Sequence, residues 1–379
     1  MGVQPALYIG LMSGTSMDGV DGVLAAFPGD GGPPIQVLAH AHRAFSADQA
    51  QSLLALNSAG PNELHRAALA GNALARLYAE GVKDLLQGAA IAPAAVSAIG
   101  AHGQTVRHQP QAFDGCGYTI QLNNPALLAE LTGIAVVADL RSRDLAAGGQ
   151  GAPLVPAFHR AVFGRDGRAL AVLNLGGMAN LTALAADGGT LGFDCGPGNA
   201  LLDHWCQRHT GQPFDDGGRW GAGGTVAAAL LAAMQAEPFF ALPPPKSTGR
   251  DLFNPAWLQA CLAGVSAATA SAAQDVQASL AELTAWSCAQ AVKQYAARSR
   301  ELLVCGGGAY NAHLMQRLAA HLPTLAVLRS DAAGLPASQV EAAAFAWLAK
   351  AFVERRPGNL ASVTGAAGPR ILGALYPAG

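Results

Sequence analysis

The chain has 379 residues, of which 51% are hydrophobic and only 13% are charged, and its formal net charge is −2. This composition excludes a disordered chain and is typical of a globular protein large enough for two domains. Because no basic cluster is present, neither nucleic acid nor an anionic membrane surface is an expected partner. No window approaches 18 uninterrupted apolar residues and no signal peptide is evident, so we expect a soluble cytoplasmic protein. Six scattered cysteines without metal-ligand spacing favour reduced thiols.

The first predicted element is a buried strand over residues 7–12, which runs into the polar sequence SGTSMDGVD at residues 13–21. Its glycines let the backbone turn sharply near a ligand, and its hydroxyl and N–H groups can hold phosphate oxygens. A carboxylate such as Asp18 is badly placed for a bare phosphate, but it is well placed if a divalent cation lies between them. The stretch therefore predicts a phosphate site, with a hairpin rich in turn residues as the alternative. It lacks the GxxxxGK[ST] pattern of a Walker loop.

The remainder of the first half alternates predicted strands with predicted helices. Strands are expected at residues 20–27, 35–41, 96–101, 118–122 and 134–140, and helices at residues 47–56, 62–87, 125–131 and 154–163. Two polar clusters lie between them, HGQTVRH at 102–108 and DLRSRDLAAGGQGAP at 139–153. The first follows a strand end, where open α/β sheets bind ligands, and it could hold sugar hydroxyls or an anionic substituent. Alternatively, its histidines satisfy backbone carbonyls of a loop.

The second half repeats the opening pattern after a loop at residues 164–168. An apolar strand at 169–175 precedes GGMAN, and strands at 181–185 and 191–193 lead into DCGPGN. Strand, glycine-rich turn, strand and carboxylate turn then occur twice, which indicates an internal duplication with ligand held between the copies.

The turn DCGPGN at residues 194–199 carries Asp194 and precedes a predicted helix at 200–209. Backbone N–H groups at a helix start favour phosphate, and Asp194 at the strand end would face the bound ligand. Alternatively, Asp194 only caps the turn. Farther on, helices are expected at residues 225–235, 275–297, from 312 and at 339–353, and a strand at 302–304.

Two more loops of the second half are candidates for ligand contact. The loop PPPKSTGRDLFN at 243–254 could read the substrate or dock one lobe on the other. Three consecutive glycines, Gly306 to Gly308, allow a flat base such as adenine to lie on the backbone, although this signal alone is weak.

Three glycine-rich turns at strand ends, two of them with an aspartate, resemble the actin-like ATPase and sugar-kinase superfamily. The implied fold is α/β, with two ribonuclease-H-like domains that close on ATP and a divalent cation. Within it the chain is identified as a member of the anhydro-N-acetylmuramic acid kinase family. The resemblance covers nearly the whole chain and rests on GLMSGTSMDGVD (10–21), AHGQTVRH (101–108), QLNNPALLAE (121–130), RDLAAGGQGAPLVPAFH (143–159), NLGGMANLT (174–182), GFDCGPGNALLD (192–203), PKSTGRDLFN (245–254), CGGGAYN (305–311) and PASQVEAAAFAWLA (336–349).

This resemblance implies phosphoryl transfer from ATP to O6 of 1,6-anhydro-N-acetylmuramic acid, coupled to opening of the anhydro bridge by water. Asp194 matches the family's base, and Asp18 would reach Mg²⁺ through water. The implied ATP contacts are Gly14, Thr15, Ser16, Met17, Asp18, Gly19, Val20, Asp21, Gly196, Pro197, Gly198, Asn199, Gly306, Gly307 and Gly308. The implied sugar contacts are His102, Gln104, Thr105, Arg143, Asp144 and Glu341, the last of which could instead cap a helix.

The implied domains are residues 1–164, with the phosphate turn and the sugar contacts, and residues 165–379, with the base and the adenosine site. The sequence departs from the family in having Asn123 for glycine, Cys195 for threonine and Asp251 for glutamate. The rival functions are an ordinary sugar or carboxylate kinase, which would use Asp194 to deprotonate a hydroxyl, and a nucleotide-switched actin-like ATPase. The sequence does not decide the oligomeric state, for which a homodimer is one option.

Overall fold

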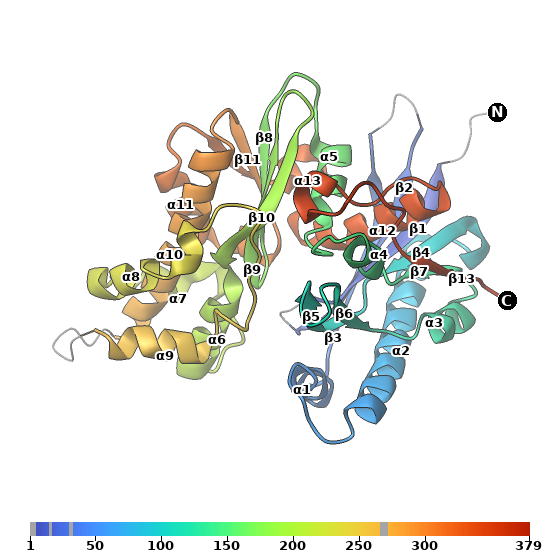
Figure 1. Ribbon diagram of the computed structural model, residues 1–379, viewed down its shortest axis with the longest axis horizontal. Coiled ribbons are helices and arrows are strands. Elements are labelled where there is room, and N and C mark those ends of the chain that lie inside the picture. The colour runs from blue at the N-terminus through green and yellow to red at the C-terminus, as the bar shows by residue number, and fades with distance from the viewer. Residues whose placement is uncertain (1–4, 15–16, 30–32, 266–271) are drawn as a thin grey trace. The chain divides into compact units, whose positions relative to one another are not determined.

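The computed structural model describes residues 5–14, 17–29, 33–265 and 272–379, which form two compact units (Figure 1). The first unit comprises the chain up to residue 162 together with residues 339–379, and the second comprises residues 163–338. The expected domain boundary at residue 164 lies close to this division, but residues 339–379 pack with the first unit rather than with the second. The reason is helix α12 (Val340–Val353), which lies so close to strand β1 (Ala6–Met12) that a Cβ atom at Gly10 would be 1.8 Å from the Ala342 carbonyl oxygen.

The main sheet of the first unit has six strands in the order β13-β7-β4-β1-β2-β3. Strands β1, β2 and β3 form an antiparallel meander, whereas β4 and β7 run parallel to β1. Beyond β1, the bounds are β2 (Gly19–Phe27), β3 (Gln36–Ala44), β4 (Val96–Ala101), β7 (Val136–Ala138) and β13 (Ala374–Tyr376).

The five-stranded sheet of the second unit has the order β10-β9-β8-β11-β12. Here β8, β9 and β10 form the antiparallel meander, and β11 and β12 are parallel to β8. The bounds are β8 (Leu170–Leu175), β9 (Met178–Leu184), β10 (Thr190–Pro197), β11 (Glu301–Cys305) and β12 (Ala326–Arg329). Both sheets therefore have the same order and strand directions, apart from β13. The topology is that expected for a duplicated ribonuclease-H-like unit, so the predicted fold class is confirmed.

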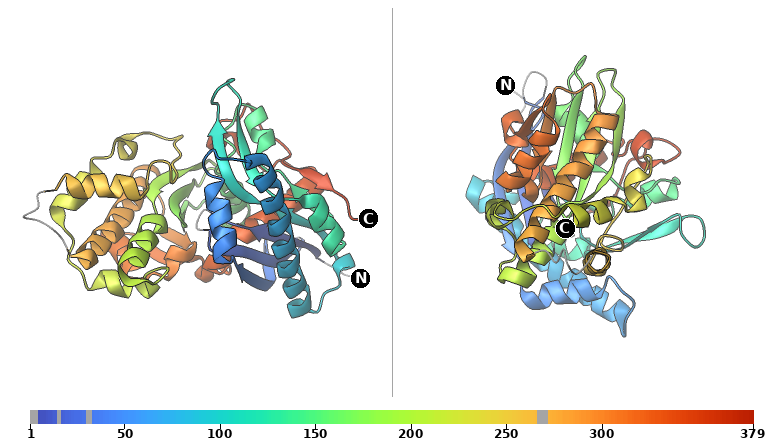
Figure 2. Two further views of the ribbon diagram at one scale, coloured as in Figure 1. Left: turned by 90° about the horizontal axis from the view of Figure 1, so that it is seen from below. Right: turned by 90° about the vertical axis from the view of Figure 1, so that its left-hand side faces the viewer.

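Helices cover both faces of the first unit's sheet (Figures 1 and 2). A Cβ atom at Gly22 would meet Leu85 of helix α2 (Glu63–Ala89), whereas Gly10 on the opposite face meets α12. The buried core between α2 and the sheet includes Ile9, Leu24 and the ring of Tyr78. The other helices of this unit are α1 (Ala47–Ala55), α3 (Pro125–Thr132), α4 (Ser142–Ala146), α5 (Val155–Phe163), α13 (Ala361–Thr364) and the 3₁₀ turn η1 (Pro93–Ala95).

The second unit is mainly helical outside its sheet. Its longest helix, α10 (Ala273–Tyr295), packs against β9 and β10 and is buried along most of its length. The other helices are α6 (Asn199–Thr210), α7 (Arg219–Ala222), α8 (Ala228–Gln235), α9 (Pro255–Ala263) and α11 (Ala312–His321). The 3₁₀ turns are η2 (Asp216–Gly218), η3 (Pro238–Ala241), η5 (Gly307–Tyr310), η6 (Ser330–Ala333) and, at the junction with α12, η7 (Ala337–Gln339).

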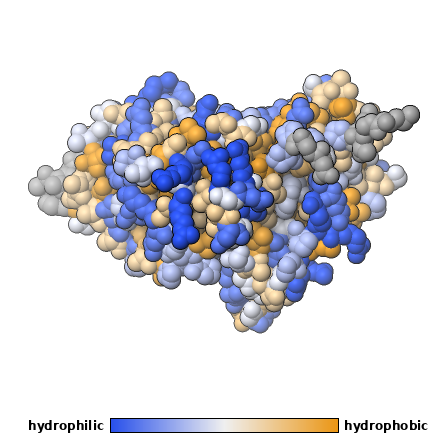
Figure 3. Space-filling model, turned by 90° about the horizontal axis from the view of Figure 1, so that it is seen from above, coloured by the Kyte–Doolittle hydropathy of each residue, from blue (hydrophilic) through white to orange (hydrophobic). Residues whose placement is uncertain are grey.

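Several helices begin at residues whose side chains accept the first free backbone N–H groups. Ser46 and Gln49 form a reciprocal capping box at α1, and Asn124, Asn254 and Asn311 cap α3, α9 and α11. The predicted start of the helix at residue 312 is thus confirmed, whereas the sequence analysis missed α9. In the part of the chain that the structure describes, no helix is both long and apolar enough to cross a membrane. On the face drawn in Figure 3, hydrophilic and hydrophobic residues are interspersed.

Candidate active site

The turn after β1 is fixed by Ser13 and by Tyr78 of α2. The Ser13 hydroxyl donates to the Gly103 carbonyl at 3.0 Å and also bonds the Tyr78 hydroxyl at 3.0 Å. The Tyr78 hydroxyl accepts the Gly103 N–H at 3.2 Å, and because the Ser13 proton is used on the Gly103 carbonyl, Tyr78 donates its own proton to Ser13. Both side chains are buried, and burial raises the pKa of Tyr78. The predicted phosphate turn is therefore held against the start of the 102–108 cluster by a neutral network that the sequence analysis did not identify.

The next residues of the turn are held through the Gly14 carbonyl. This oxygen accepts the Met17 N–H at 3.3 Å and the Gln104 side-chain amide at 3.1 Å. Met17 has a φ of 57°, which is uncommon for a non-glycine residue, and its side chain packs on an apolar cluster that includes Leu53 and Leu56. Thr15 and Ser16, both predicted ATP contacts, lie outside the described residues.

Asp18 is exposed, and the three predicted ATP contacts after it belong to strand β2. A Cβ atom at Gly19 would be 2.3 Å from the Arg43 carbonyl oxygen, so this position needs glycine. Val20 is buried in the core, which leaves only its backbone for a nucleotide. Asp21 bonds two histidines of β3, at 3.3 Å to His40 and 3.0 Å to His42.

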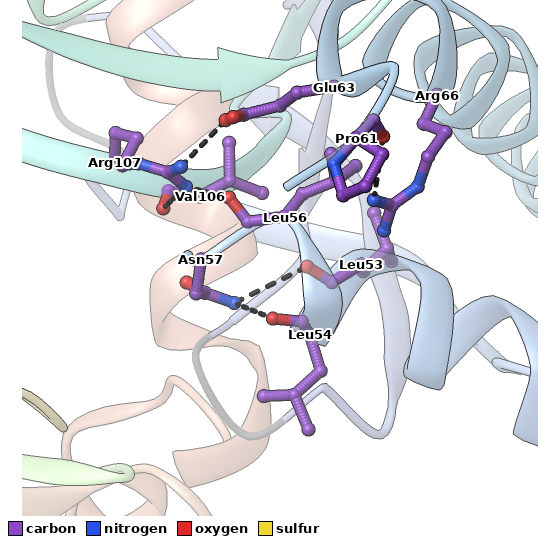
Figure 4. Close-up of polar contacts among 9 residues, drawn as sticks. All are labelled: Leu53, Leu54, Leu56, Asn57, Pro61, Glu63, Arg66, Val106 and Arg107. Atoms are coloured by element: carbon purple, nitrogen blue, oxygen red, sulfur yellow. Dashed lines mark hydrogen bonds and ion pairs between the residues drawn. The ribbon is translucent and has the colours of Figure 1, made fainter. Parts of the chain in front are cut away.

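The 102–108 cluster includes a strand, β5 (Gln104–Pro110), which pairs with β6 (Gly117–Leu122) in a separate two-stranded sheet. The pairing of the two strands has a register shift between Thr105 and Arg107, as at a β-bulge. Arg107 points to the α1–α2 connection, where it bonds the Leu56 carbonyl and pairs with Glu63 at 2.6 Å (Figure 4). In this arrangement the guanidinium of Arg107 is used within the first unit, so it is not available to hold a sugar.

His102 is buried and lies between Ser13 and Arg141. Arg141 donates to His102 Nε2 from both Nε and Nη2, at 3.2 and 2.8 Å, and to the Gly151 carbonyl from Nη1 at 2.7 Å. Because a guanidinium can only donate, Nε2 accepts and Nδ1–H donates to the Ser13 carbonyl at 3.3 Å. Burial and then the charge of Arg141 lower the pKa of His102, so the ring is neutral. Arg141 connects the glycine-rich 148–151 segment to the phosphate turn.

Asp144 is fully buried, whereas its neighbour Arg143 is exposed. Oδ1 of Asp144 accepts hydrogen bonds from Asn359 at 2.6 Å and from Thr364 at 2.8 Å, and Oδ2 accepts the Gly151 N–H at 2.8 Å. Asp144 therefore fixes the glycine-rich segment to the chain after α12, and in this arrangement no part of it is accessible to a sugar.

Of the other predicted sugar contacts, Gln104 is buried and Thr105 is partly exposed. Besides its bond to Gly14, the Gln104 side-chain amide donates a hydrogen bond only to the Thr105 carbonyl among the described residues, and its Oε1 is buried without a hydrogen bond. Thr105 accepts a hydrogen bond from Gln121 at 3.2 Å. Glu341 lies in the first turn of α12 but does not cap it, since the N-cap residue is Gln339. Burial lowers the pKa of Arg141 to about 10, and the negative charge of Glu341 opposes that change.

In the second unit, Asp194 lies in β10, just before a register irregularity that spans Cys195. Its own N–H donates to the Lys246 carbonyl at 3.1 Å, and its Oδ2 accepts the Thr248 N–H at 2.9 Å. Burial raises the pKa of Asp194 to about 7, and the Thr248 hydrogen bond and the charge of Lys246 oppose that rise. A carboxylate with this pKa can accept a proton near neutral pH, as a general base must. The 243–254 loop thus contacts Asp194 directly.

The turn that follows Asp194 packs on the turn between β8 and β9. The Gly176 carbonyl accepts the Asn199 N–H at 2.8 Å, and the Gly177 carbonyl accepts the Gly198 N–H at 3.0 Å. A Cβ atom at Gly198 would lie 2.3 Å from the Gly176 oxygen. Because these amides at the start of α6 are used within the unit, they are not free to grip a phosphate, contrary to the expectation from the helix start. Pro197, which has no N–H, is buried beside them.

The glycines at 306–308 lie against the same two turns. Gly306 has a φ of 81°, and a Cβ atom there would be 2.4 Å from Oδ1 of Asn174. A Cβ atom at Gly308 would be 3.0 Å from Oδ1 of Asn199. The structure therefore brings together two of the predicted ATP-binding turns. It adds residues 174–177, which the sequence analysis noted only as part of the repeated pattern.

The first unit's turn offers one exposed carboxylate, that of Asp18, as a ligand for a magnesium ion. Among the described residues, no group of three or more His, Cys, Asp or Glu side chains is placed to hold a metal. Mg²⁺ usually keeps several waters and is bound by one or two carboxylates together with substrate phosphates. Asp18, which is exposed within the predicted phosphate turn, supplies one carboxylate of that kind.

The sequence matches one protein family along almost its entire length. Residues 6–378 match the family model described as anhydro-N-acetylmuramic acid kinase. Proteins of that name from Variovorax paradoxus and Albidiferax ferrireducens are 64% and 60% identical, and each alignment covers 98% of this chain and 99% of the relative. The one from Cupriavidus pinatubonensis is 56% identical over 100% of both chains. The solved activator of 2-hydroxyisocaproyl-CoA dehydratase from Clostridium difficile aligns over 92% of this chain and 96% of its own, with 11% identity and a TM-score of 0.48, too remote for any functional argument.

Proposed function

This chain belongs to the anhydro-N-acetylmuramic acid kinase family, and we propose that Asp194 is the general base of its reaction. The enzyme is a kinase that uses ATP to phosphorylate 1,6-anhydro-N-acetylmuramic acid, and the family's general role is peptidoglycan recycling. We further propose that phosphorylation is coupled to opening of the anhydro bridge. The products are then N-acetylmuramic acid 6-phosphate and ADP.

The chemistry of the sugar supports a base that acts on water. In the anhydro sugar O6 is bonded to C1 and carries no proton, so a base cannot activate it directly. Asp194 instead removes a proton from the water that attacks C1. The water oxygen bonds C1, the C1–O6 bond breaks, O6 bonds the γ-phosphorus and the bond to ADP breaks. A base of this kind typically accelerates a reaction by about 10²–10⁴-fold.

The surroundings of its carboxyl group support the assignment of Asp194 as the base. Its carboxyl group is partly buried, its Oδ2 is held by the Thr248 amide, and its pKa of about 7 suits proton transfer at neutral pH. A carboxylate that only capped a turn would gain nothing from such a pKa. Buried carboxyl groups with raised pKa values are a common feature of catalytic sites.

We assign the β- and γ-phosphates of ATP to the turn at residues 14–21 and the adenosine to residues 306–308. The turn at 196–199 holds residues 176–177 in place and thereby shapes the nucleotide site. Asp18 is the proposed ligand of Mg²⁺, through water. When bound, that ion would neutralise part of the negative charge on the phosphates.

For the sugar, we propose contacts with Gln104, Thr105, Arg143 and Glu341. His102 and Asp144 act behind them, since His102 orients the phosphate turn and Asp144 fixes the 148–151 segment. Because ATP is the phosphoryl donor, we place the enzyme in the cytoplasm.

Asp194→Asn tests the proposal. The variant should bind ATP but lose turnover, with the loss mainly in kcat, since a base acts only in the transition state. ADP release is followed at saturating sugar and ATP, and nucleotide binding is measured by titration calorimetry. A variant that keeps most of its turnover would remove Asp194 from the mechanism.

A further inference from the structure

The hairpin of β5 and β6 has one face made entirely of polar side chains. Thr105 lies opposite Gln121 in the pairing of the two strands, and His108 lies opposite Thr119. Thr119 and Gln121 are two residues apart, so they share a face of β6. Thr105 and His108 are three residues apart, but the register shift between them adds one residue to β5 and brings both to that same face. We call these four residues the polar face.

The amide group of Gln121 is oriented by the two threonines of the polar face. Its nitrogen donates to Thr105 Oγ1 at 3.2 Å and to Thr119 Oγ1 at 2.7 Å. Because an amide nitrogen has two N–H groups, both are used within the hairpin. The amide oxygen of Gln121 accepts no hydrogen bond from any of the described residues. This oxygen is therefore an acceptor available to a ligand.

The ring of His108 is held by Thr119, whose Oγ1 lies 2.9 Å from Nδ1. The other acceptor for the Thr119 proton, the Arg107 carbonyl, is 3.5 Å away, longer than the roughly 2.5–3.0 Å of most O–H···O bonds. Thr119 therefore donates to Nδ1, and the ring proton is on Nε2. Burial and then the charge of Arg141 lower the pKa of His108 to about 4, so the ring is neutral near pH 7.

The Nε2 atom of His108 is buried, and it has no hydrogen-bond partner in the part of the chain that the structure describes. Buried polar groups of native proteins are nearly always hydrogen bonded. A buried N–H without a protein partner therefore indicates that a ligand supplies the acceptor.

The polar face adjoins the cluster at residues 139–153. Near the tip of the hairpin, the Gln111 side-chain amide donates to the Gly148 carbonyl at 3.0 Å, and α4 packs against β6. The proposed sugar contacts Thr105 and Arg143 belong to this hairpin and to α4. The available donor and acceptor of the polar face therefore lie next to the proposed sugar site of the first unit.

We propose that the polar face binds the acetamido group of the sugar: Gln121 Oε1 accepts the N–H of this group, and His108 Nε2 donates to its carbonyl. This inference rests on the proposed sugar site. An acetamido group presents one donor and one acceptor, and the polar face supplies the complementary pair. The sugar's lactyl carboxylate is a poorer match, because carboxylates are bound most strongly by charged donors and all four side chains of the face are neutral.

Two substitutions of His108 separate the roles of its ring nitrogens. The amide of His108→Asn can take the place of Nδ1 and keep the bond to Thr119, whereas that of His108→Gln can take the place of Nε2. His108→Asn should raise the Kd for 1,6-anhydro-N-acetylmuramic acid about tenfold, as expected for one lost hydrogen bond at a buried site. His108→Gln should bind within about threefold of the wild type.

A substitution on the other strand tests the acceptor independently of His108. Gln121→Leu should also raise the Kd for the sugar about tenfold. Gln109→Leu is the matched control, because Gln109 is exposed in the same hairpin, and it should bind as the wild type does. Gln121→Leu also keeps the test decisive if thermal unfolding shows that His108→Asn does not fold.

Binding is measured by titration calorimetry on the full chain with a non-hydrolysable ATP analogue, so no turnover is needed. Each protein is titrated with 1,6-anhydro-N-acetylmuramic acid and with an analogue that has a hydroxyl group in place of the acetamido group. With this analogue, wild type, His108→Asn and Gln121→Leu should bind alike, because the contact that the variants remove is already absent.

Two results would overturn the proposal. If His108→Asn binds as the wild type does while His108→Gln binds more weakly, His108 serves only to hold Thr119. If His108→Asn and Gln121→Leu lose the same affinity for both sugars, the polar face does not recognise the acetamido group. The proposed function fails separately: a wild-type enzyme that binds the anhydro sugar without consuming ATP would refute the proposed reaction, and the calorimetry would still decide the role of the polar face.

Discussion

Asp194→Asn should be more stable to unfolding than the wild type, by a margin that grows as the pH rises, and it should lack turnover. The pKa of Asp194 is raised from its ordinary 3.8 to about 7 by burial. Between these values the native state holds a proton that the unfolded chain has lost, so the free energy of unfolding falls as the pH rises. At about 1.4 kcal/mol per unit, the whole shift corresponds to at most about 4 kcal/mol. Asparagine has nearly the same shape but does not titrate, so the variant does not lose this free energy of unfolding as the pH rises.

The assay is urea unfolding of wild type and Asp194→Asn at pH 5 and pH 8. Most of the titration lies between these two values, so the stability difference should be about 1–3 kcal/mol larger at pH 8 than at pH 5. Asp166→Asn, an exposed substitution in the same unit, should show no such growth. If the difference in unfolding free energy between Asp194→Asn and wild type is the same at both pH values, Asp194 is not a desolvated carboxylate. Its proposed role as the base then loses its support.

Three further substitutions test other parts of the account. Asp18→Ala should raise the Mg²⁺ concentration needed for half-maximal activity, or abolish activity, without lowering the melting temperature; wild-type behaviour across a magnesium titration would show that the phosphate turn is misassigned. Asp144→Ala leaves three buried donors without their acceptor, so urea unfolding should show a loss of about 2–4 kcal/mol, and a loss below about 1 kcal/mol would contradict its structural role. Gly306→Ala forces a side chain into positive φ at a cost of about 1–2 kcal/mol and against Asn174, so the Kd for ATP should rise about tenfold; an unchanged Kd in calorimetry would separate residues 306–308 from the nucleotide.

The fold could be predicted largely because its signals are local. The apolar runs of β1 and β8, each followed by a glycine-rich turn, marked the start of each copy, and the two sheets have the same strand order. The return of residues 339–379 to the first unit could not be read locally, because it depends on a close approach between α12 and Gly10 over more than three hundred residues of chain.

The site was predicted less completely, because burial and partners decide the role of a polar side chain. Asp144 and Arg107 have the residue types of sugar contacts, yet both are used within the first unit. Arg141 lies in the same 139–153 cluster as Asp144. Only its hydrogen bonds to His102 and Gly151 show that it connects two loops. Likewise, no pattern in the sequence shows that an amide of the 243–254 loop meets Asp194.

The most direct test of the central claim compares two sugars at equal concentration. In the coupled mechanism, cleavage of the C1–O6 bond makes O6 the nucleophile, whereas an ordinary kinase needs a hydroxyl proton that Asp194 can remove. N-acetylmuramic acid offers that hydroxyl at O6 but has already lost the anhydro bridge. ADP release is measured with each sugar at saturating ATP and Mg²⁺. We predict turnover with 1,6-anhydro-N-acetylmuramic acid and almost none with N-acetylmuramic acid; comparable rates with both would contradict the coupled mechanism and leave an ordinary sugar kinase.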